Sequence, residues 1–128
     1  MNEGRENIIV SKSYAFALEI VNLYKILISS SKEYVLSKQF LRAGTSIGAN
    51  VNEAISSETK KDFVHKLGIA LKEARETAYW INLLKDSNYI SLEDYSKTIN
   101  QCNELIRIIS SIIITTKEKY LNKSIHNS

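Results

Sequence analysis

Two acidic residues one helical turn apart, Glu73 and Glu76, have the types and spacing closest to a catalytic arrangement in this chain. A pair of carboxylates on one side of a helix can act as general acid and general base when it is buried. The more common outcome is an ion pair with Arg42 or another basic side chain, which is the interpretation we favour. Tyr79 and Trp80 follow directly, and we expect them to be packing or interface anchors rather than platforms for nucleic-acid bases.

The sequence contains few residues that could form a metal site or act as a catalytic nucleophile. A di-iron centre in a helical bundle needs two Glu-x-x-His pairs and two further glutamates. The chain offers one related spacing, Asp62-x-x-His65, and its other histidine, His126, lies near the C-terminus. Cys102 falls on an apolar stripe without a neighbouring histidine, which is typical of a core thiol. We therefore predict no catalytic residue, no metal site, no cofactor and a protein that is not an enzyme.

Three polar residues and a small one also share one side of the preceding helical segment. Arg42, Ser46, Ala49 and Glu53 follow steps of four, three and four residues. This side can contact another subunit or nucleic acid, or it can form ion pairs within the fold. We favour the structural or interface interpretation, because arginine beside small residues commonly pairs with a carboxylate. Asn50 lies within the neighbouring apolar seam, where a polar residue can fix the register of packed helices.

Gly44 and Gly48 stand one turn apart in the interior of the same segment. Each glycine costs about 1 kcal/mol relative to alanine in a helix interior. Close approach by a neighbouring helix would offset this cost, since glycine has no side chain to hold the neighbour away. A local kink is the alternative explanation. We expect the close approach.

Lysines are denser at two places, although most basic residues are interleaved with acidic ones, as on a solvated surface. The first place is a predicted turn, and the second is the end of the last helical segment. Short connections between helices would bring both to the same end of a bundle. Phosphate contacts there would bind nucleic acid without reading its sequence. The candidate nucleic-acid-binding residues are Lys60, Lys61, Lys117, Lys119 and Lys123.

Apolar residues recur at helical spacing in four segments, and hydroxyl residues mark their starts. Ser30 with Glu33 has the capping-box spacing, Ser57 is the expected N-cap of the third segment, and Ser91 is that of the fourth. The four predicted helices cover residues 11–29, 31–55, 58–87 and 92–121. Such helices with short connections predict an all-α protein, an antiparallel up-down-up-down four-helix bundle.

The predicted seams of the second and third helices each follow one heptad stripe, and the last helix carries two stripes. A helix with two apolar stripes lies centrally or is covered by another subunit. The stripe of the second helix is Leu36, Phe40, Ala43, Ile47, Asn50 and Ala54. That of the third is Phe63, Leu67, Ala70, Ala74, Thr77, Ile81 and Leu84. Those of the last are Tyr95, Ile99, Cys102, Ile106, Ile109, Ile113, Thr116 and Tyr120, and beside it Leu105, Ile108 and Ile112.

The composition agrees with one helical domain. A chain of 128 residues with no proline and four glycines has too few turn residues for a sheet protein of this size. We predict a single domain over residues 8–121 and flexible tails at 1–7 and 122–128. The single cysteine is typical of a reducing cytoplasm, and no segment reaches the roughly 20 apolar residues of a membrane span. The net charge of +3 is too mild to identify one copy as a nucleic-acid binder.

The runs RAGTSIGANVNEA and KDFVHKLGIALKEARETAYWINLL resemble the small bacterial proteins encoded in intervening sequences of 23S rRNA genes. The resemblance covers about residues 8–121. It implies a four-helix bundle that assembles as a ring, a homopentamer in known members. The family is similar to the accessory protein of diversity-generating retroelements, a pentameric bundle that works with a reverse transcriptase and binds nucleic acid. The residues that carry the resemblance are Gln39, Arg42, Ala43, Ser46, Ile47, Asn50, Glu53, Lys72, Glu73, Ala74, Glu76, Thr77, Tyr79 and Trp80.

Together these features predict a non-enzymatic, homo-oligomeric scaffold associated with RNA or DNA. An oligomer multiplies the charge of each chain, so that repeated basic ends can bind phosphates together. The alternative prediction is a protein-interaction module that docks a partner protein without nucleic acid. For both, we expect a cytoplasmic location and no membrane partner.

Overall fold

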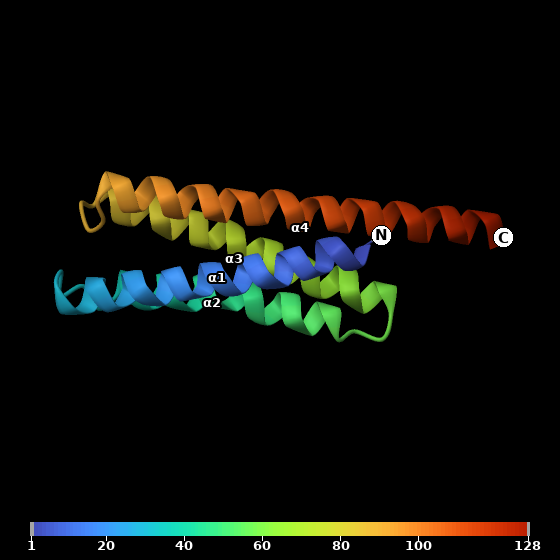
Figure 1. The fold of residues 1–128 in the computed structure, drawn as a ribbon, viewed down its shortest axis with the longest axis horizontal. Coiled ribbons are helices and arrows are strands. Elements are labelled where there is room, and N and C mark those ends of the chain that lie inside the picture. Colours follow the sequence, from blue (N-terminus) through green and yellow to red (C-terminus); the bar gives the residue numbers. More distant parts are fainter. Residues whose placement is uncertain (1, 128) are drawn as a thin grey trace.

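The computed structural model describes the backbone of residues 2–127 and the side chains of residues 4–120. It contains four helices, α1 (Asn2–Ser29), α2 (Leu36–Ile55), α3 (Lys60–Asp86) and α4 (Leu92–Asn127). No strand occurs between residues 2 and 127. All four helices lie lengthwise along the molecule; each contacts the next along the chain, and α1 also contacts α4 (Figure 1). The prediction of an all-α chain with four helices is confirmed.

The first and last helices are longer than predicted. Helix α1 begins at Asn2 rather than near residue 11, and α4 continues to Asn127, so helical backbone covers residues 2–7 and 122–127. At the start of α1, the guanidinium of Arg5 donates to the Thr115 hydroxyl of α4 at 3.3 Å, and Ile9 is fully buried. The hydrogen bonds of Arg5 hold the first turns of α1 against α4. No proline interrupts either helix, which leaves the helical backbone free to continue.

Helix α2 starts later than the predicted capping box at Ser30. The carboxylate of Glu33 accepts backbone N–H groups of Ser37 at 2.7 Å and Val35 at 3.2 Å, and this caps a helix that begins at residue 36. Burial raises the pKa of Glu33, but hydrogen bonds from Ser37, Leu36 and Val35 outweigh it and hold that pKa below its ordinary value. The predicted capping box at Ser30 is wrong: Val35 occupies the N-cap position, and the Glu33 side chain supplies the acceptors for the free N–H groups.

The predicted N-cap of α3 is wrong, and the predicted N-cap of α4 is confirmed. Thr59, not Ser57, is the N-cap of α3, because its hydroxyl accepts the backbone N–H of Asp62 at 3.0 Å. Helix α4 begins as predicted, since the backbone N–H of Asp94 donates to the hydroxyl of Ser91 at 3.1 Å.

The core confirms the predicted seam of α3 and corrects that of α4. Every predicted seam residue of α3 is buried. In α4 the isoleucines at 99, 106 and 113 are only half-buried, because the buried stripe runs between the two predicted ones. Thr98, near the start of α4, is buried but polar, and a search for apolar residues alone left it out. The buried positions of α4 are Thr98, Cys102, Leu105, Ile109, Ile112 and Thr116.

The two glycines of α2 allow α1 to approach closely. A Cβ at Gly44 would lie 2.7 Å from both Cγ atoms of the Ile20 side chain. A Cβ at Gly48 would lie 3.4 Å from the backbone oxygen of Ser13. The predicted close approach is confirmed, and the packing of α1 on α2 offsets the poor helix propensity of glycine.

The contact between α1 and α4 is the smallest of the four between helices. Besides Arg5, it includes two exposed ion pairs, Lys12–Glu104 and Lys97–Glu19, each at 3.2 Å. Within the described residues, none of the helices combines the length and apolar character that a membrane span requires.

Candidate functional site

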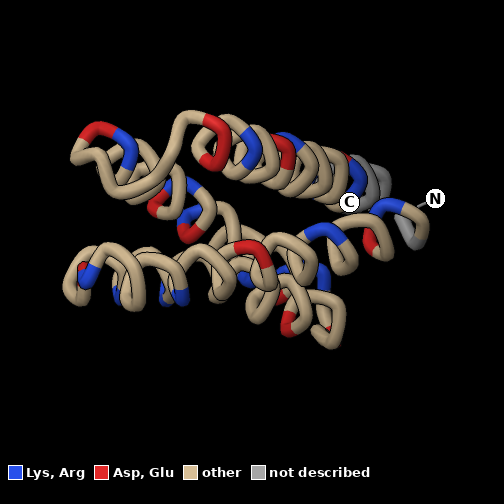
Figure 2. Tube along the Cα trace, turned by 60° about the vertical axis from the view of Figure 1, so that its left-hand side comes forward, with Lys and Arg blue, Asp and Glu red and all other residues tan. Residues whose placement is uncertain are grey.

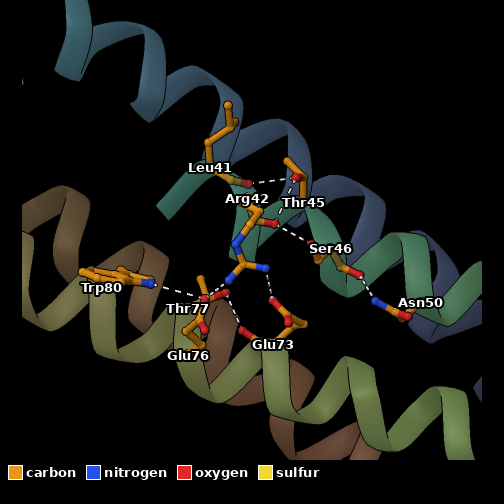
Figure 3. A network of polar contacts seen from close by, with 9 residues as sticks. All are labelled: Leu41, Arg42, Thr45, Ser46, Asn50, Glu73, Glu76, Thr77 and Trp80. Atoms are coloured by element: carbon orange, nitrogen blue, oxygen red, sulfur yellow. Dashed lines mark hydrogen bonds and ion pairs between the residues drawn. The ribbon is translucent and has the colours of Figure 1, made fainter. Parts of the chain in front are cut away.

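Arg42 of α2 lies between the two candidate carboxylates of α3 (Figure 3). Its Nη1 is 3.0 Å from Oε2 of Glu73, and its Nη2 bonds Oε2 of Glu76. The indole Nε1 of Trp80 donates to the same Glu76 oxygen at 3.4 Å. The predicted ion pair within the bundle is therefore confirmed.

This arrangement holds two helices together rather than preparing a proton transfer. A catalytic carboxylate pair would need burial away from a compensating cation. Here one guanidinium donates to both carboxylates, and Arg42 is itself about half exposed. The arrangement that would have favoured an enzyme, carboxylates away from any arginine, is not found at Glu73 and Glu76.

The remaining polar residues of this side of α2 bond within their own helix or to a nearby lysine. The hydroxyl of Ser46 donates to the Arg42 carbonyl at 2.6 Å, and the amide of Asn50 donates to the Ser46 carbonyl at 2.9 Å (Figure 3). Asn50 is half-buried, and Val51 takes the buried position beside it, so the predicted place of Asn50 in the seam is wrong. Glu53 lies 3.7 Å from Lys66 of α3.

Cys102 is a core thiol, as predicted. It is fully buried, and its Sγ donates to the carbonyl of Ala74 at 3.2 Å. Burial raises its pKa to about 12, so the reactive thiolate is absent at neutral pH. Among the described residues, no group of three or more His, Cys, Asp and Glu side chains is arranged to hold a metal ion.

A hollow of about 530 Å³ lies where the start of α3 meets the last part of α4. Lys60, Lys61 and Val64 of α3 line it together with Lys117 and Tyr120 of α4. Three of the five lysines named from the sequence are thus brought together, although α3 and α4 supply them from distant parts of the chain.

The other two predicted lysines are not part of this lining. Lys119 is exposed on α4 and does not line the hollow, and the side chain of Lys123 lies outside the described residues. Sequence reasoning missed Tyr120 as a site residue, because its helical spacing placed it on a core seam. The structure leaves its ring exposed.

Basic and acidic residues are both spread over the helices (Figure 2). Four lysines outside the hollow, Lys12, Lys66, Lys85 and Lys97, form ion pairs with acidic residues. In the part of the chain with described side chains, Lys60, Lys61 and Lys117 make no ion pair, and no acidic residue lines the hollow. Lys60 and Lys61 also open α3, where the helix dipole disfavours cations and attracts anions. The site is suited to an anion.

Most of the chain is similar to known proteins. The family model described as 23S rRNA-intervening sequence protein matches residues 5–111. A crystal structure of a protein of unknown function from the S23 ribosomal protein family of Bacteroides thetaiotaomicron VPI-5482 shares 50% sequence identity with this chain. It superposes with a TM-score of 0.84 over 85% of this chain and 97% of that one. A search of curated proteins found no match.

Lys117 and Tyr120 lie beyond the last matched residue, so the hollow combines a matched segment with an unmatched one. The Arg42 network, in contrast, lies wholly within the match. The extent of the match, together with the four helices, shows that the chain belongs to the 23S rRNA-intervening sequence protein family.

Proposed function

We propose that the protein is a non-enzymatic, homo-oligomeric scaffold that binds nucleic acid through its phosphates. The observation that carries this proposal is the convergence of Lys60, Lys61 and Lys117 on one hollow without an acidic partner among the described side chains. Lysine ammonium groups bind phosphate as point charges and read no sequence. Lys119, on the same helix, adds positive charge to this end of the molecule without lining the hollow.

The protomer of this scaffold is an antiparallel up-down-up-down bundle, and several copies, five by family resemblance, form a ring. The net charge of +3 is small for one copy, and a ring multiplies it on one particle. Exposed apolar side chains support such an assembly: Tyr14, Leu18 and Ile26 of α1 are each more than half exposed. Multi-angle light scattering is expected to give the mass of several chains, and the mass of one chain contradicts the ring.

Filter binding at two salt concentrations tests the nucleic-acid role. Three phosphate contacts per copy predict an affinity that falls roughly 20- to 40-fold between 50 and 200 mM salt. The variant Lys60→Gln/Lys61→Gln/Lys117→Gln is expected to lose most of the binding. Lys38→Gln, at the other end of α2, is the matched control and is expected to bind normally. Absence of binding to RNA and DNA at low salt contradicts the proposal.

The second candidate function is a protein-interaction module that docks a partner without nucleic acid. Tyr79 of α3 favours it, because this ring is 59% exposed and packs edge-on against Trp80 with centroids 5.0 Å apart. Exposed aromatic anchors are typical of interface hot spots. A partner protein retained in a pull-down after nuclease treatment, and lost in Tyr79→Ala, would support this function over the first.

A further inference from the structure

The hollow between α3 and α4 has an apolar wall as well as lysines. Val64 and the ring of Tyr120 line it, and the alkyl stems of Lys60, Lys61 and Lys117 can add to the same wall while their ammonium groups stay in water. A site for phosphate alone would be built from cations and N–H donors, and would leave this apolar wall without a partner. The wall therefore indicates a ligand with an apolar or aromatic part next to its negative charge.

The exposure of Tyr120 leaves its ring open to stacking. Tyr120 is 62% exposed although it lines the hollow, so much of its surface is accessible to a ligand. Aromatic rings next to basic side chains are the usual means by which proteins hold unpaired bases, with stacking for the base and lysines for the flanking phosphates. The volume of about 530 Å³ lies within the range of about 300–1,000 Å³ of sites for small ligands.

We infer that the hollow receives an unpaired nucleotide, with its base against Tyr120 and its flanking phosphates on Lys60, Lys61 and Lys117, so that the protein prefers single-stranded nucleic acid over duplex. This inference rests on the proposed nucleic-acid binding and names its ligand. In a duplex the faces of the bases are covered by their neighbours, and only the phosphates can reach the lysines. The apolar wall then contacts no base, and the duplex binds only through the charge of its phosphates.

Fluorescence anisotropy with the full chain at low salt tests the inference. The probes are a labelled oligothymidylate, a labelled oligouridylate and a labelled DNA duplex of equal length. Tyr120→Ala is expected to weaken binding of both single strands about 5- to 150-fold, as removal of one stacking ring does. The same substitution is expected to change duplex binding by less than about twofold, because the phosphate contacts remain.

Two matched controls separate stacking from other effects. Tyr120→Phe keeps the ring and is expected to bind single strands as the unchanged protein does. Tyr34→Ala removes a similarly exposed ring, 54%, from the turn between α1 and α2 and is expected to leave binding unchanged. Circular dichroism of each variant confirms that its helix content is retained.

The possible failures are distinguishable. If the unchanged protein binds single strand and duplex equally and Tyr120→Ala weakens neither, the single-strand inference is wrong while binding through phosphates stands. Equal weakening of single strand and duplex by Tyr120→Ala also overturns it. If the unchanged protein binds no probe at low salt, both the inference and the proposed function are wrong.

Discussion

Helix α1 is held on its two sides by different physical means. Against α2 it packs closely, with Ile20 over Gly44 and the backbone of Ser13 near Gly48. Against α4 it makes its smallest contact, and there Lys12 and Glu19 form exposed ion pairs with α4. Close packing depends on shape and tolerates little change, whereas exposed ion pairs contribute little and are screened by salt. We therefore expect the α1–α2 seam to be sensitive to substitution and the α1–α4 seam to be tolerant.

The largest expected effect is at Gly44. In Gly44→Ala the new Cβ would meet both Cγ atoms of Ile20 at 2.7 Å, and a buried, branched side chain cannot move aside without shifting the helices. We expect a loss of about 1–3 kcal/mol in the free energy of unfolding, as for other overpacked cores. Urea unfolding followed by circular dichroism measures it. An unchanged or raised stability would show that the α1–α2 seam is not closely fitted.

Glu33 in the α1–α2 turn gives the next effect. Glu33→Gln removes the charged cap of α2 and is expected to cost about 0.5–2 kcal/mol at pH 7. Because the pKa of Glu33 is lowered in the folded protein, its contribution is complete above the unfolded value near 4.5 and is lost as pH falls through the folded pKa. Urea unfolding at pH 6 and at pH 3 is expected to show a difference between variant and unchanged protein that narrows at low pH. A constant difference contradicts the capping role.

Gly68 is the matched control for Gly44 and changes stability in the opposite direction. It lies inside α3, exposed, and a Cβ added there would have no other atom within 4 Å beyond its own stretch of helix. Gly68→Ala is expected to raise the free energy of unfolding by about 0.5–1 kcal/mol through helix propensity alone. Destabilisation of this variant in urea unfolding would indicate that a second copy or a partner covers this surface.

The smallest effect is expected at the α1–α4 ion pair. A double-mutant cycle with Lys12→Gln and Glu104→Gln is expected to give a coupling of about 0.2–1 kcal/mol, because both side chains are more than two fifths exposed. The coupling is expected to vanish at 1 M salt, where the Debye length falls to about 3 Å and exposed charges are strongly screened. A coupling that persists in high salt, as measured by urea unfolding, would show that another subunit buries this seam.

Prediction from sequence succeeded where the buried residues are apolar or small at regular spacing. The seam of α3 needs only its heptad pattern, and the Arg42 pairing follows from the helical position of Arg42 opposite the carboxylates of α3. Prediction failed where a buried residue is polar or where an exposed residue is largely apolar. Thr98, which belongs to neither predicted stripe, is buried although polar, while Tyr120, predicted on a stripe of α4, is 62% exposed. The burial of these residues depends on the tertiary packing around them, which the local sequence pattern does not specify.

The ends of the chain and the hollow show a second limit. The early start of α1 depends on Arg5, whose hydroxyl partners Ser111 and Thr115 lie more than a hundred residues away. The grouping of Lys60 with Lys117 could be foreseen, since short turns fix which helix ends meet. The apolar wall that Tyr120 contributes could not, because helical spacing alone does not distinguish a ring in a core from a ring in an open hollow.

Because Cys102 is buried, the folded protein is expected not to react with thiol reagents. Its sulfur is closed off from solvent and bonded to the Ala74 carbonyl, so a maleimide or disulfide reagent has no path to it while the helices stay packed. A cysteine engineered at the surface can therefore be labelled alone, without first removing the natural one. In the unaltered protein, the rate at which Cys102 is modified then measures how often the core opens.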